Sequence, residues 1–449
     1  MFSTILAEIF GWKHYGQPKK FKRFVINSKE VGKGDLFIPL KGSKFDGHIF
    51  IREALDRGAA GFLFERGKIP PYRLKELTEK AFALEVSDTF KALRRIAAYR
   101  REQFKGKQIV AVTGTAGKTT TKELIAHLLE GVSTVYKNPG NLNSRIGFPL
   151  SLANAREETD FWVFELGASE RRNIKSSVSL LKPTASVLTS LGKAHLEGFG
   201  NFENLTVAKG EIFLPDTVKV SVLPARFFHL YKTLLRDRRT VTFGEGGDVK
   251  VQLYRFTADG QTELVLNGKK YRVNLLGFGV IKAVEAAAAL LKALELPYTE
   301  LLEDRLTTFK GLWGRMQPLR GKGFLVINDA YNANPLSMFS ALRTLLEVEG
   351  YTRRVAILGD MLELGRFERE EHRRLGRLLD TVAVDEVYLA GKLSVWTCAE
   401  VKNKPCHHFY HTEELLRFLK TREPRKDTVY LIKGSRGLKM EKLLEVFIP

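Results

Sequence analysis

VAVTGTAGKTTTKELI, residues 110–125, is the stretch that decides how the chain is organised. An apolar run ends at Thr113, a glycine-rich turn follows, and a helix-forming segment begins near Lys118. A strand, a glycine turn and a helix N-terminus in this order surround an anion with backbone N–H groups. The lysine can reach the β- and γ-phosphates, and the hydroxyl of Thr119 is placed to meet Mg²⁺. The stretch therefore predicts a phosphate-binding loop.

The loop is two residues shorter than the usual G-x-x-x-x-G-K-[ST] pattern, because Val112 occupies the position five before Gly117. The shortening removes none of the parts that bind phosphate. We expect the following residues to contact the nucleotide: Gly114, Thr115, Ala116, Gly117, Lys118, Thr119 and Thr120. By itself the loop predicts a nucleotide and no particular reaction.

Strands alternate with helices on both sides of the loop, which predicts an α/β protein with parallel sheets. The pair Asn267-Gly268 is a preferred two-residue hairpin turn and indicates a β insert in the central part. We expect a central P-loop-type, mostly parallel sheet and a C-terminal doubly wound, Rossmann-like domain. A length of 449 residues fits three domains, with these boundaries: 1–80, 81–312 and 313–449.

The composition is that of a globular protein outside the membrane, with 44% hydrophobic and 27% charged residues. No apolar run reaches the ~18 residues of a membrane span. The start of the chain lacks the basic segment and cleavage site of a signal peptide. Two cysteines, Cys398 and Cys406, form no disulfide framework and are typical of a reducing compartment. We therefore expect a cytoplasmic protein with two incidental thiols.

The net charge of +21 raises the question of a polyanionic partner. The basic residues are scattered and are not interleaved with aromatic residues in a nucleic-acid-binding motif. We expect a solvated basic surface and no nucleic-acid partner. The alternative is a P-loop protein that uses ATP for motion on DNA or RNA, with steep salt dependence.

Other chemistry-bearing residues follow the loop. Glu165 ends the apolar run FWVFE, where a lone carboxylate is costly unless it meets a cation, in a salt bridge or a metal site. His195 lies in a glycine-rich loop after a strand, a place where ligands bind. Lys209 has no role that spacing predicts. Lys433 and Arg436 lie in LIKGSRG at the end of a predicted strand. The fork-shaped guanidinium of Arg436 is suited to bind a carboxylate. An ordinary surface loop is the alternative interpretation.

Three segments together resemble the Mur ligases, the ATP-dependent amide-forming enzymes of bacterial cell-wall synthesis. They are TGTAGKTTT (113–121), SLGKAHLEGFGNFENLTVAKGEI (190–212) and GRMQPLRGKGFLVINDAYNANP (314–335). The resemblance implies ATP and Mg²⁺, with a carbamylated Lys209. It assigns catalysis to Lys118, Glu165, His195 and Lys209, the metal to Thr119, Glu165, His195 and Lys209, and nucleotide contacts to Arg315, Asp329 and Asn332.

Within this family the chain is most similar to the member that joins D-alanyl-D-alanine to UDP-N-acetylmuramoyl-tripeptide through an acyl phosphate. The similarity lies in DAYNANP (329–335), AILGDMLELG (356–365) with His372 beyond it, and NPGNLNSRIGFPL (138–150). A related ligase that adds a single amino acid is the alternative. The resemblance implies a monomer whose N-terminal domain binds the UDP-substrate and whose C-terminal domain binds the dipeptide. Its implied substrate contacts are Ser28, Lys29, Lys44, Asp46, Asn141, Asn143, Lys433 and Arg436.

The chain departs from the family pattern at two places. Gly279, Val280 and Ala283 stand where the family has a histidine and two asparagines near the adenine. Adenine recognition therefore differs here, or nucleotide selectivity is relaxed. Ser144 stands where a second asparagine is common, so Asn141 and Asn143 are the substrate contacts expected in that stretch.

Overall fold

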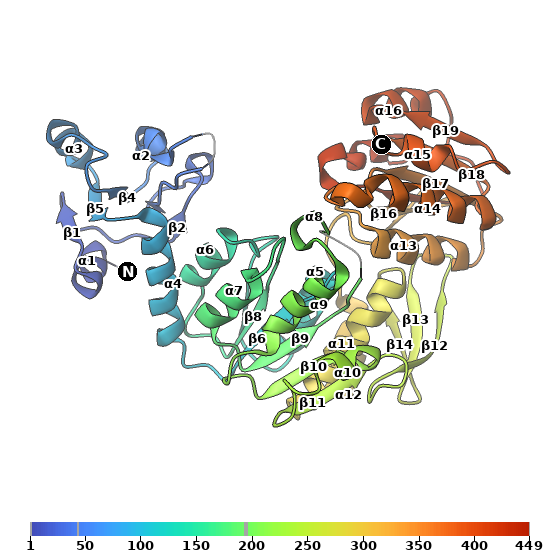
Figure 1. The fold of residues 1–449 in the computed structure, drawn as a ribbon, viewed down its shortest axis with the longest axis horizontal. Helices are drawn as coiled ribbons and strands as arrows, with labels where there is room; N and C mark the ends of the chain where they lie inside the picture. Colours follow the sequence, from blue (N-terminus) through green and yellow to red (C-terminus); the bar gives the residue numbers. More distant parts are fainter. Residues whose placement is uncertain (1, 43–44, 193–195, 449) are drawn as a thin grey trace. The chain divides into compact units, whose positions relative to one another are not determined.

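The chain forms two compact units (Figure 1). The computed structural model describes residues 2–42, 45–192 and 196–448. The first unit contains Met1–Lys107 and Asn138–Thr159, and the second contains Gln108–Lys137 and Asp160–Pro449.

The first unit contains a five-stranded sheet of order β1-β5-β4-β3-β2. Strands β2 to β5 are parallel, and β1 pairs with β5 in the antiparallel direction. The strands are β1 (Lys13–Tyr15), β2 (Phe24–Val25), β3 (Leu36–Phe37), β4 (Gly61–Glu65) and β5 (Phe82–Val86). The helices are α1 (Ser3–Phe10), α2 (Ile51–Asp56), α3 (Pro71–Thr78), α4 (Thr89–Gln103) and α6 (Gly147–Ala153).

Two polar side chains explain how α4 begins and how the segment 138–159 joins the first sheet. Asp88 caps α4, because its side chain accepts a hydrogen bond of 2.7 Å from the N–H of Lys91. Asn154, directly after α6, pairs with the edge strand β2 as a further strand would. Its Oδ1 accepts from the Phe24 N–H at 2.9 Å, and its Nδ2 donates to the Phe24 carbonyl at 3.0 Å. The side chain thereby ties the segment 138–159 to the first sheet.

The second unit begins with a six-stranded sheet of order β11-β10-β9-β6-β8-β7, in which all pairs are parallel. Its strands are β6 (Gln108–Thr113), β7 (Val135–Lys137), β8 (Phe161–Glu165), β9 (Ala185–Leu188), β10 (Val220–Pro224) and β11 (Arg239–Phe243). Every residue of β8, β9 and β10 is buried, as expected for a parallel sheet covered on both faces. The predicted central parallel sheet is confirmed.

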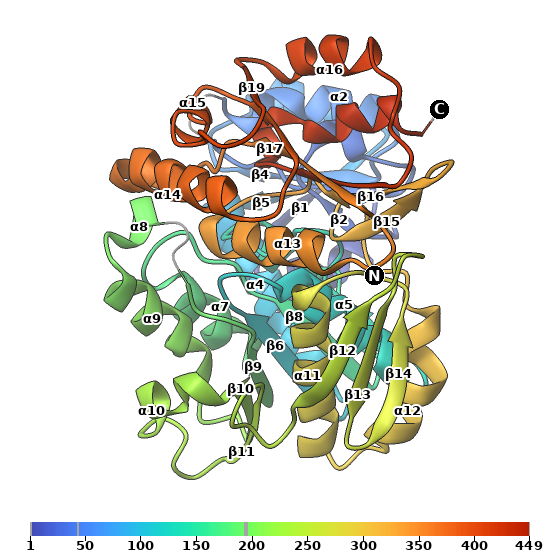
Figure 2. The ribbon, with the colours of Figure 1, turned by 90° about the vertical axis from the view of Figure 1, so that its right-hand side faces the viewer.

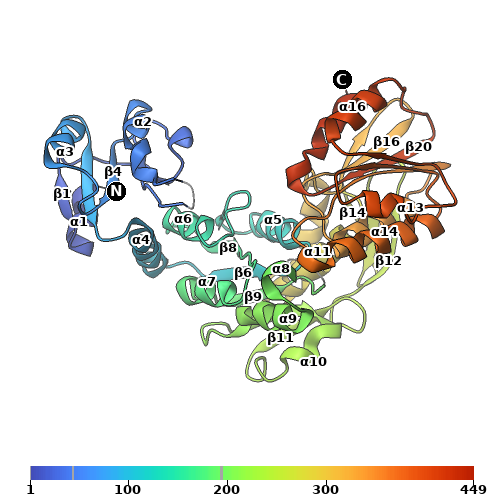
Figure 3. The ribbon, with the colours of Figure 1, turned by 45° about the horizontal axis from the view of Figure 1, so that its top comes forward.

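Helices cover both faces of this sheet (Figure 3). They are α5 (Lys118–Leu129), α7 (Asn173–Leu181), α8 (Leu196–Phe199), α9 (Phe202–Gly210), α10 (Phe228–Tyr231), α11 (Phe278–Ala293) and α12 (Tyr298–Arg305). Helices α5 and α11 pack together on one face, and α7 and α9 lie on the other. The predicted β insert is a three-stranded antiparallel sheet of β12 (Val251–Phe256), β13 (Thr262–Leu266) and β14 (Lys269–Val273). Its β13–β14 turn places Asn267 and Gly268 at positive φ, as a two-residue hairpin requires.

The C-terminal sheet has six strands in the order β15-β16-β20-β17-β18-β19. Its elements are drawn in orange and red in Figure 2. Only β15 is antiparallel to its neighbour. The strands are β15 (Gln317–Arg320), β16 (Phe324–Asp329), β17 (Arg353–Gly359), β18 (Glu386–Ala390), β19 (Cys406–Phe409) and β20 (Thr428–Lys433). The helices are α13 (Pro335–Glu347), α14 (Glu368–Thr381), α15 (Val395–Cys398) and α16 (Thr412–Lys420).

Residues of β20 alternate between the two faces of this sheet. Val429 and Leu431 belong to the core that contains α13 and α14, whereas Tyr430 and Ile432 pack with α16. The predicted doubly wound fold is confirmed. The edge strands β15 and β19 were not predicted, because their half-buried, partly polar residues lack the apolar runs of the four inner strands.

Helix α11 connects the cores within the second unit. It packs on α5, on β10 and on α13, and its central alanines, 286–289, are fully buried. Small side chains allow the neighbouring elements to approach closely. Among the residues that the structure describes, no helix is long and apolar enough to span a membrane.

His372 of α14 is fully buried in a neutral arrangement. Its Nδ1 donates to the Glu368 carbonyl at 2.7 Å, and its Nε2 accepts from the Met361 N–H at 3.1 Å. Both ring nitrogens are thereby used by one uncharged tautomer. Burial lowers the pKa of His372, and the nearby carboxylates of Asp360 and Glu368 oppose this shift without cancelling it.

We predict that acidification from about pH 7 to about pH 5 destabilises the protein partly through His372. The unfolded chain takes up a proton near the usual pKa of about 6.5, whereas the buried ring stays neutral, so stability falls with pH below that value. Thermal unfolding of the wild type and of His372→Gln across this range measures the effect. His14 and His127, whose pKa values are also lowered by burial, are common to both proteins. Equal pH slopes in the two proteins would contradict the prediction.

Candidate functional site

The phosphate loop lies between β6 and α5, and a close approach of its backbone to a neighbouring strand end fixes its path. Gly114 has a φ of 152°, and a Cβ there would lie 2.0 Å from Thr189 Oγ1 and 2.9 Å from the Ser190 nitrogen. Gly117 has a φ of 79° and is the N-cap of α5. A side chain is therefore excluded by contact at Gly114 and disfavoured by conformation at Gly117.

Hydroxyl groups that follow β9 hold the loop in place. The N–H of Thr115 donates to the Ser190 carbonyl at 3.0 Å, and that of Ala116 donates to Ser190 Oγ at 2.9 Å. Thr189 Oγ1 donates to the Ala116 carbonyl at 2.6 Å. These hydroxyls were not predicted from the sequence. Their position, directly after a strand that neighbours β6, is the signal that could have indicated them.

These contacts determine which backbone groups face an anion. The N–H groups of Thr115 and Ala116 donate hydrogen bonds to Ser190 and so do not face an anion. The first-turn N–H groups of α5 have no partner within their own helix, because the residues that would accept precede it. The anion site of the loop is therefore the N-terminus of α5, which begins at Lys118 and continues with the buried Thr119 and the half-buried Thr120.

Lys118 folds back over the loop. Its Nζ donates to the Gly114 carbonyl at 3.0 Å and to the Thr115 carbonyl at 3.4 Å. Burial lowers the pKa of Lys118, Glu165 opposes this shift, and the positive charge of Arg315 adds to it. Glu165 and Arg315 each lie within electrostatic reach of Lys118, so the predicted phosphate-binding lysine and one predicted nucleotide contact share a neighbourhood.

Glu165 and Lys209 are both buried near the loop. Glu165 ends β8, opposite Val112 of β6, and is 2% exposed. Lys209 lies in the last turn of α9, is 1% exposed, and places its Nζ 5.9 Å from the centre of the Phe199 ring. Burial lowers the pKa of Lys209 well below its usual value. The charge of Lys118 adds to this shift, while Glu165 opposes it.

The predicted metal ligands lie only partly within the described residues. His195 lies outside them, as does the predicted substrate contact Lys44. Among the described residues no three His, Cys, Asp or Glu side chains form a cluster able to hold a metal. Thr119 and Glu165 offer the oxygen atoms that Mg²⁺ prefers. Lys209 fits the same set only after carbamylation, since an ammonium group repels a cation and a carbamate offers oxygen.

The C-terminal part of the second unit contributes two arginines around one tyrosine. The guanidinium of Arg315 lies 4.0 Å from the centre of the Tyr331 ring, and that of Arg436 lies 5.7 Å from it. Arg436 is exposed, and its Nη1 donates to Glu441 Oε1 at 3.0 Å. Tyr331 was not predicted from the sequence, although it lies within DAYNANP, beside the predicted Asp329 and Asn332.

Asp329 and Lys433 form a buried ion pair next to these arginines. Lys433 is 1% exposed, and its Nζ donates to Asp329 Oδ2 at 2.6 Å and to the Asn332 carbonyl at 2.8 Å. Asp329 Oδ1 accepts from the Met316 N–H at 3.1 Å. The lysine and the aspartate therefore have strong partners within the protein, while the side chain of Asn332 is exposed. Ligand contacts by these three residues stay predictions.

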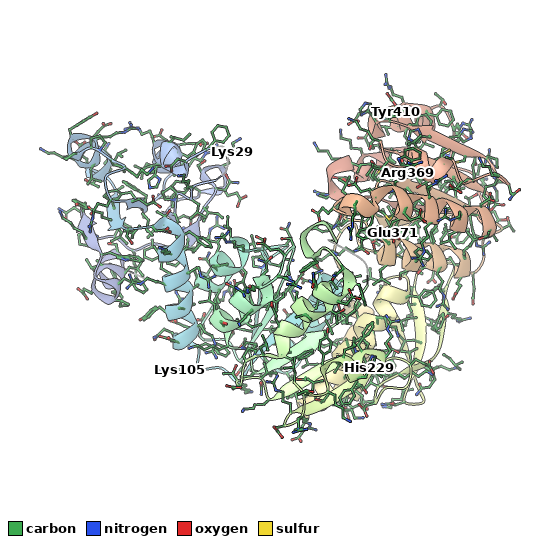
Figure 4. The ribbon with its side chains drawn as sticks, in the orientation of Figure 1. Lys29, Lys105, His229, Arg369, Glu371 and Tyr410 are labelled. Carbon is green, nitrogen blue, oxygen red and sulfur yellow. The ribbon has the colours of Figure 1, made fainter. Side chains whose placement is uncertain are left out.

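The remaining predicted substrate contacts belong to the first unit. Ser28 is buried and donates to Glu53 Oε2 at 2.8 Å, whereas Lys29 is exposed (Figure 4). Asp46 accepts from Lys68 Nζ at 2.8 Å and from His48. These hydrogen bonds lower the pKa of Asp46 and outweigh its partial burial, which acts in the opposite sense.

Asn141 and Asn143 lie in turns before α6, where the Asn143 N–H donates to the Asn141 carbonyl at 2.7 Å. They share the first unit with Ser28, Lys29 and Asp46. The structure thus brings Lys118, Glu165, Lys209 and Arg315 together in the second unit and leaves the contacts of these asparagines with substrate as predictions.

The start of α11 carries the departures from the family pattern. Gly279 faces open space, since a Cβ there would meet no atom within 4 Å. Val280 and Ala283 are buried. None of the three positions offers a hydrogen-bonding side chain to a base. The partly buried Phe278 precedes them, with the Arg343 guanidinium 3.9 Å from its ring centre.

We predict that Gly114→Ala weakens nucleoside triphosphate binding at least roughly tenfold, because the new methyl group displaces the loop from Thr189 and Ser190. Gly32→Ala is the matched control, since a Cβ there would meet no atom nearer than 3.6 Å and the residue belongs to the first unit. Binding of a fluorescent ATP analogue to each variant is the measurement. Wild-type affinity in Gly114→Ala, with an unchanged circular dichroism spectrum, would contradict the steric argument.

Comparison with known families and proteins covers almost the entire chain. Residues 20–101 match the model of the Mur ligase family catalytic domain, residues 112–293 the Mur ligase middle domain, and residues 314–436 the Mur ligase glutamate ligase domain. The UDP-N-acetylmuramoyl-tripeptide–D-alanyl-D-alanine ligase of Escherichia coli (strain K12) is 31% identical over 453 residues, which cover 98% of this chain and 96% of the relative.

Solved structures give the same result. A crystal structure of MurF from Acinetobacter baumannii has a TM-score of 0.86 and 29% identity, with coverage of 99% of this chain and 97% of the other. MurF ligase from Thermotoga maritima, solved in complex with ADP, has a TM-score of 0.81 and 32% identity, with coverage of 95% and 97%. The shortened phosphate loop, the buried glutamate and lysine beside it, and similarity along nearly the full length lead to one conclusion: the chain belongs to the Mur ligase family.

Proposed function

We propose that this protein is an ATP-dependent ligase that joins D-alanyl-D-alanine to UDP-N-acetylmuramoyl-tripeptide, giving the pentapeptide precursor of peptidoglycan. The observation that carries the proposal is the similarity to a relative of that name over 98% of this chain and 96% of the relative. Similarity of this extent spans all the residues that we propose to contact the UDP-substrate and the dipeptide. The protein would act in the cytoplasm as a monomer.

The first step activates the terminal carboxylate of the tripeptide. Amide formation from a free carboxylate in water is uphill, and an acyl phosphate provides a good leaving group. The carboxylate and the triphosphate are both anions, so their approach requires positive charge between them. Lys118, at the N-terminus of α5, and Arg315, whose charge acts on Lys118, would provide that charge.

The second step is the attack of the dipeptide amine on the acyl phosphate, which releases phosphate and forms the amide. The dipeptide carries a carboxylate that must be held away from the reacting carbon. Arg436 is the exposed guanidinium beside Tyr331 and suits this carboxylate. Lys433 would take part only by shifting its hydrogen bond from Asp329.

Lys209 is the residue whose environment supports carbamylation. A buried ammonium group costs several kcal/mol unless it is paired, and the lowered pKa of Lys209 favours the neutral amine. A neutral amine adds CO₂ and loses a proton to give a carbamate. The side chain, which is a cation when protonated, thereby becomes an anion. Glu165 and the carbamate, with Thr119 and His195, would then hold Mg²⁺, which neutralises charge on the phosphates.

We predict that phosphate release from ATP requires both UDP-N-acetylmuramoyl-tripeptide and D-alanyl-D-alanine, because each step consumes one of them. Separate reactions with the dipeptide, with single amino acids and with no amine are compared, and mass spectrometry identifies the product. A product heavier by the dipeptide is expected. Release with a single amino acid would point instead to a ligase for another step. Release stimulated by DNA or RNA alone would point to a nucleic-acid motor.

We predict that the reaction also depends on CO₂ through Lys209. Wild-type protein in CO₂-depleted buffer should lose most of its phosphate release and regain it with bicarbonate, because carbamylation is reversible. Lys209→Ala should stay inactive under both conditions. Carbon-13 NMR with labelled bicarbonate should show a carbamate signal in the wild type and none in the variant. A fully active wild type without CO₂, or the same signal in both proteins, would contradict carbamylation while leaving the dipeptide test unaffected.

A further inference from the structure

The two cysteines of the chain lie in contact within the C-terminal part of the second unit. Cys398 ends α15 and Cys406 begins β19, eight positions later. Their Sγ atoms are 2.7 Å apart, and both thiols are free and half-buried. The sequence has only these two cysteines, which were predicted to be incidental. The structure places them where a single covalent bond would connect a helix to an edge strand.

Helix α15 is fixed from the side of α14. The guanidinium of Arg369, labelled in Figure 4, lies 4.2 Å from the centre of the Trp396 ring. Thr397 Oγ1 donates to the carbonyl of the buried His372 at 3.1 Å. Arg373 Nε donates to Glu400, just beyond α15, at 2.6 Å. Cys398 is therefore held by contacts on both sides of it in the chain.

Cys406 and the loop that connects it to Cys398 are fixed independently. Cys406 is in register with Val387 of β18, whose N–H donates to the Pro405 carbonyl at 3.0 Å. Asp380 accepts from the N–H groups of Lys402 at 2.6 Å and Asn403 at 2.7 Å. The two sulfur atoms are thus brought together by hydrogen bonds that do not involve them, so a bond between them requires little rearrangement.

The pair contains a nucleophile and a resolving thiol. The hydrogen bond between the two sulfur atoms lowers the pKa of Cys398 to about 7, although burial opposes this shift. The same hydrogen bond raises the pKa of Cys406. Near neutral pH a substantial fraction of Cys398 is a thiolate, the form that attacks a disulfide.

We propose that Cys398 and Cys406 are a modification site, which low-molecular-weight disulfides such as oxidised glutathione convert to an intramolecular disulfide that fastens α15 to β19. The proposal does not depend on the catalytic activity proposed above.

The exchange takes place in two balanced steps. The Cys398 thiolate attacks one sulfur of glutathione disulfide, forms a mixed disulfide and releases one glutathione thiolate. Cys406 then loses its proton, and its thiolate attacks Cys398 Sγ, forms the intramolecular bond and releases the second glutathione. The two cysteine thiols lose two electrons, and the glutathione disulfide gains them.

The bond would stabilise the edge of the C-terminal sheet. The bond closes a short loop, so it reduces the conformational entropy of the unfolded chain only modestly. The two sulfur atoms are already in contact, so the folded state needs little adjustment to form the bond. We therefore expect the oxidised protein to unfold at a temperature higher by about 5 °C.

The test uses the full chain, reduced and then equilibrated with oxidised glutathione. Thiols are counted in denaturant, the intact mass is measured, and thermal unfolding is recorded before and after reduction. Cys398→Ser and Cys406→Ser are matched controls, each with one sulfur and with a side chain of nearly the same size. Circular dichroism of both variants establishes that they are folded.

The wild type should lose both thiols, become lighter by two hydrogen atoms, carry no glutathione and remain monomeric on a non-reducing gel. Each single variant should instead retain one bound glutathione, because no second sulfur is present to release it. Two thiols that remain titratable in the wild type would overturn the proposal. So would stable glutathione adducts on the wild type, or a disulfide that connects two chains.

Discussion

The contact of Gly114 with the hydroxyl group of Thr189 and the backbone of Ser190 is the constraint on which the nucleotide site depends. Strands β6 and β9 are parallel neighbours, so their carboxyl ends reach the same edge of the sheet. A residue without a Cβ lets the loop lie directly on the end of β9, with its Cβ position only 2.0 Å from Thr189 Oγ1. The N–H groups of Thr115 and Ala116 are then occupied by Ser190. What remains for an anion is the N-terminus of α5, which is why a loop two residues shorter keeps the same chemistry.

Beside the loop the electrostatic potential is set mainly by positively charged groups, among them Lys118 and Lys209, that are shielded from solvent. Burial lowers the pKa of both Lys118 and Lys209, the charge of Lys118 lowers that of Lys209 further, and Glu165 opposes the shift of both. Such an arrangement favours the binding of anions and the neutral form of the more deeply buried lysine. The buried Lys433 differs because a direct ion pair of 2.6 Å with the half-buried Asp329 satisfies it. Lys209 is thus suited to chemistry, whereas Lys433 is suited to holding Asp329 in place.

Much of the fold followed from local patterns, and less of the site did. The glycine loop, the parallel strands around it and the Asn267-Gly268 hairpin each depend on a few adjacent residues, and all were confirmed. The edge strands β15 and β19 were missed, because half-buried strands lack a continuous apolar run. The hydroxyls of Thr189 and Ser190 were missed because their role depends on a partner some seventy positions earlier.

The sequence by itself determined the phosphate loop, the α/β class and the family, because these depend on residue order within short segments and on motifs spread along the chain. The tertiary structure alone decided the environment of Lys209, which reads as an ordinary surface lysine in the sequence and is 1% exposed in the fold. It also decided the contact of Tyr331 with two arginines and that of Cys398 with Cys406. Burial and proximity between distant residues arise from the packing of whole elements, and the physical properties they control, pKa and reactivity, follow that packing.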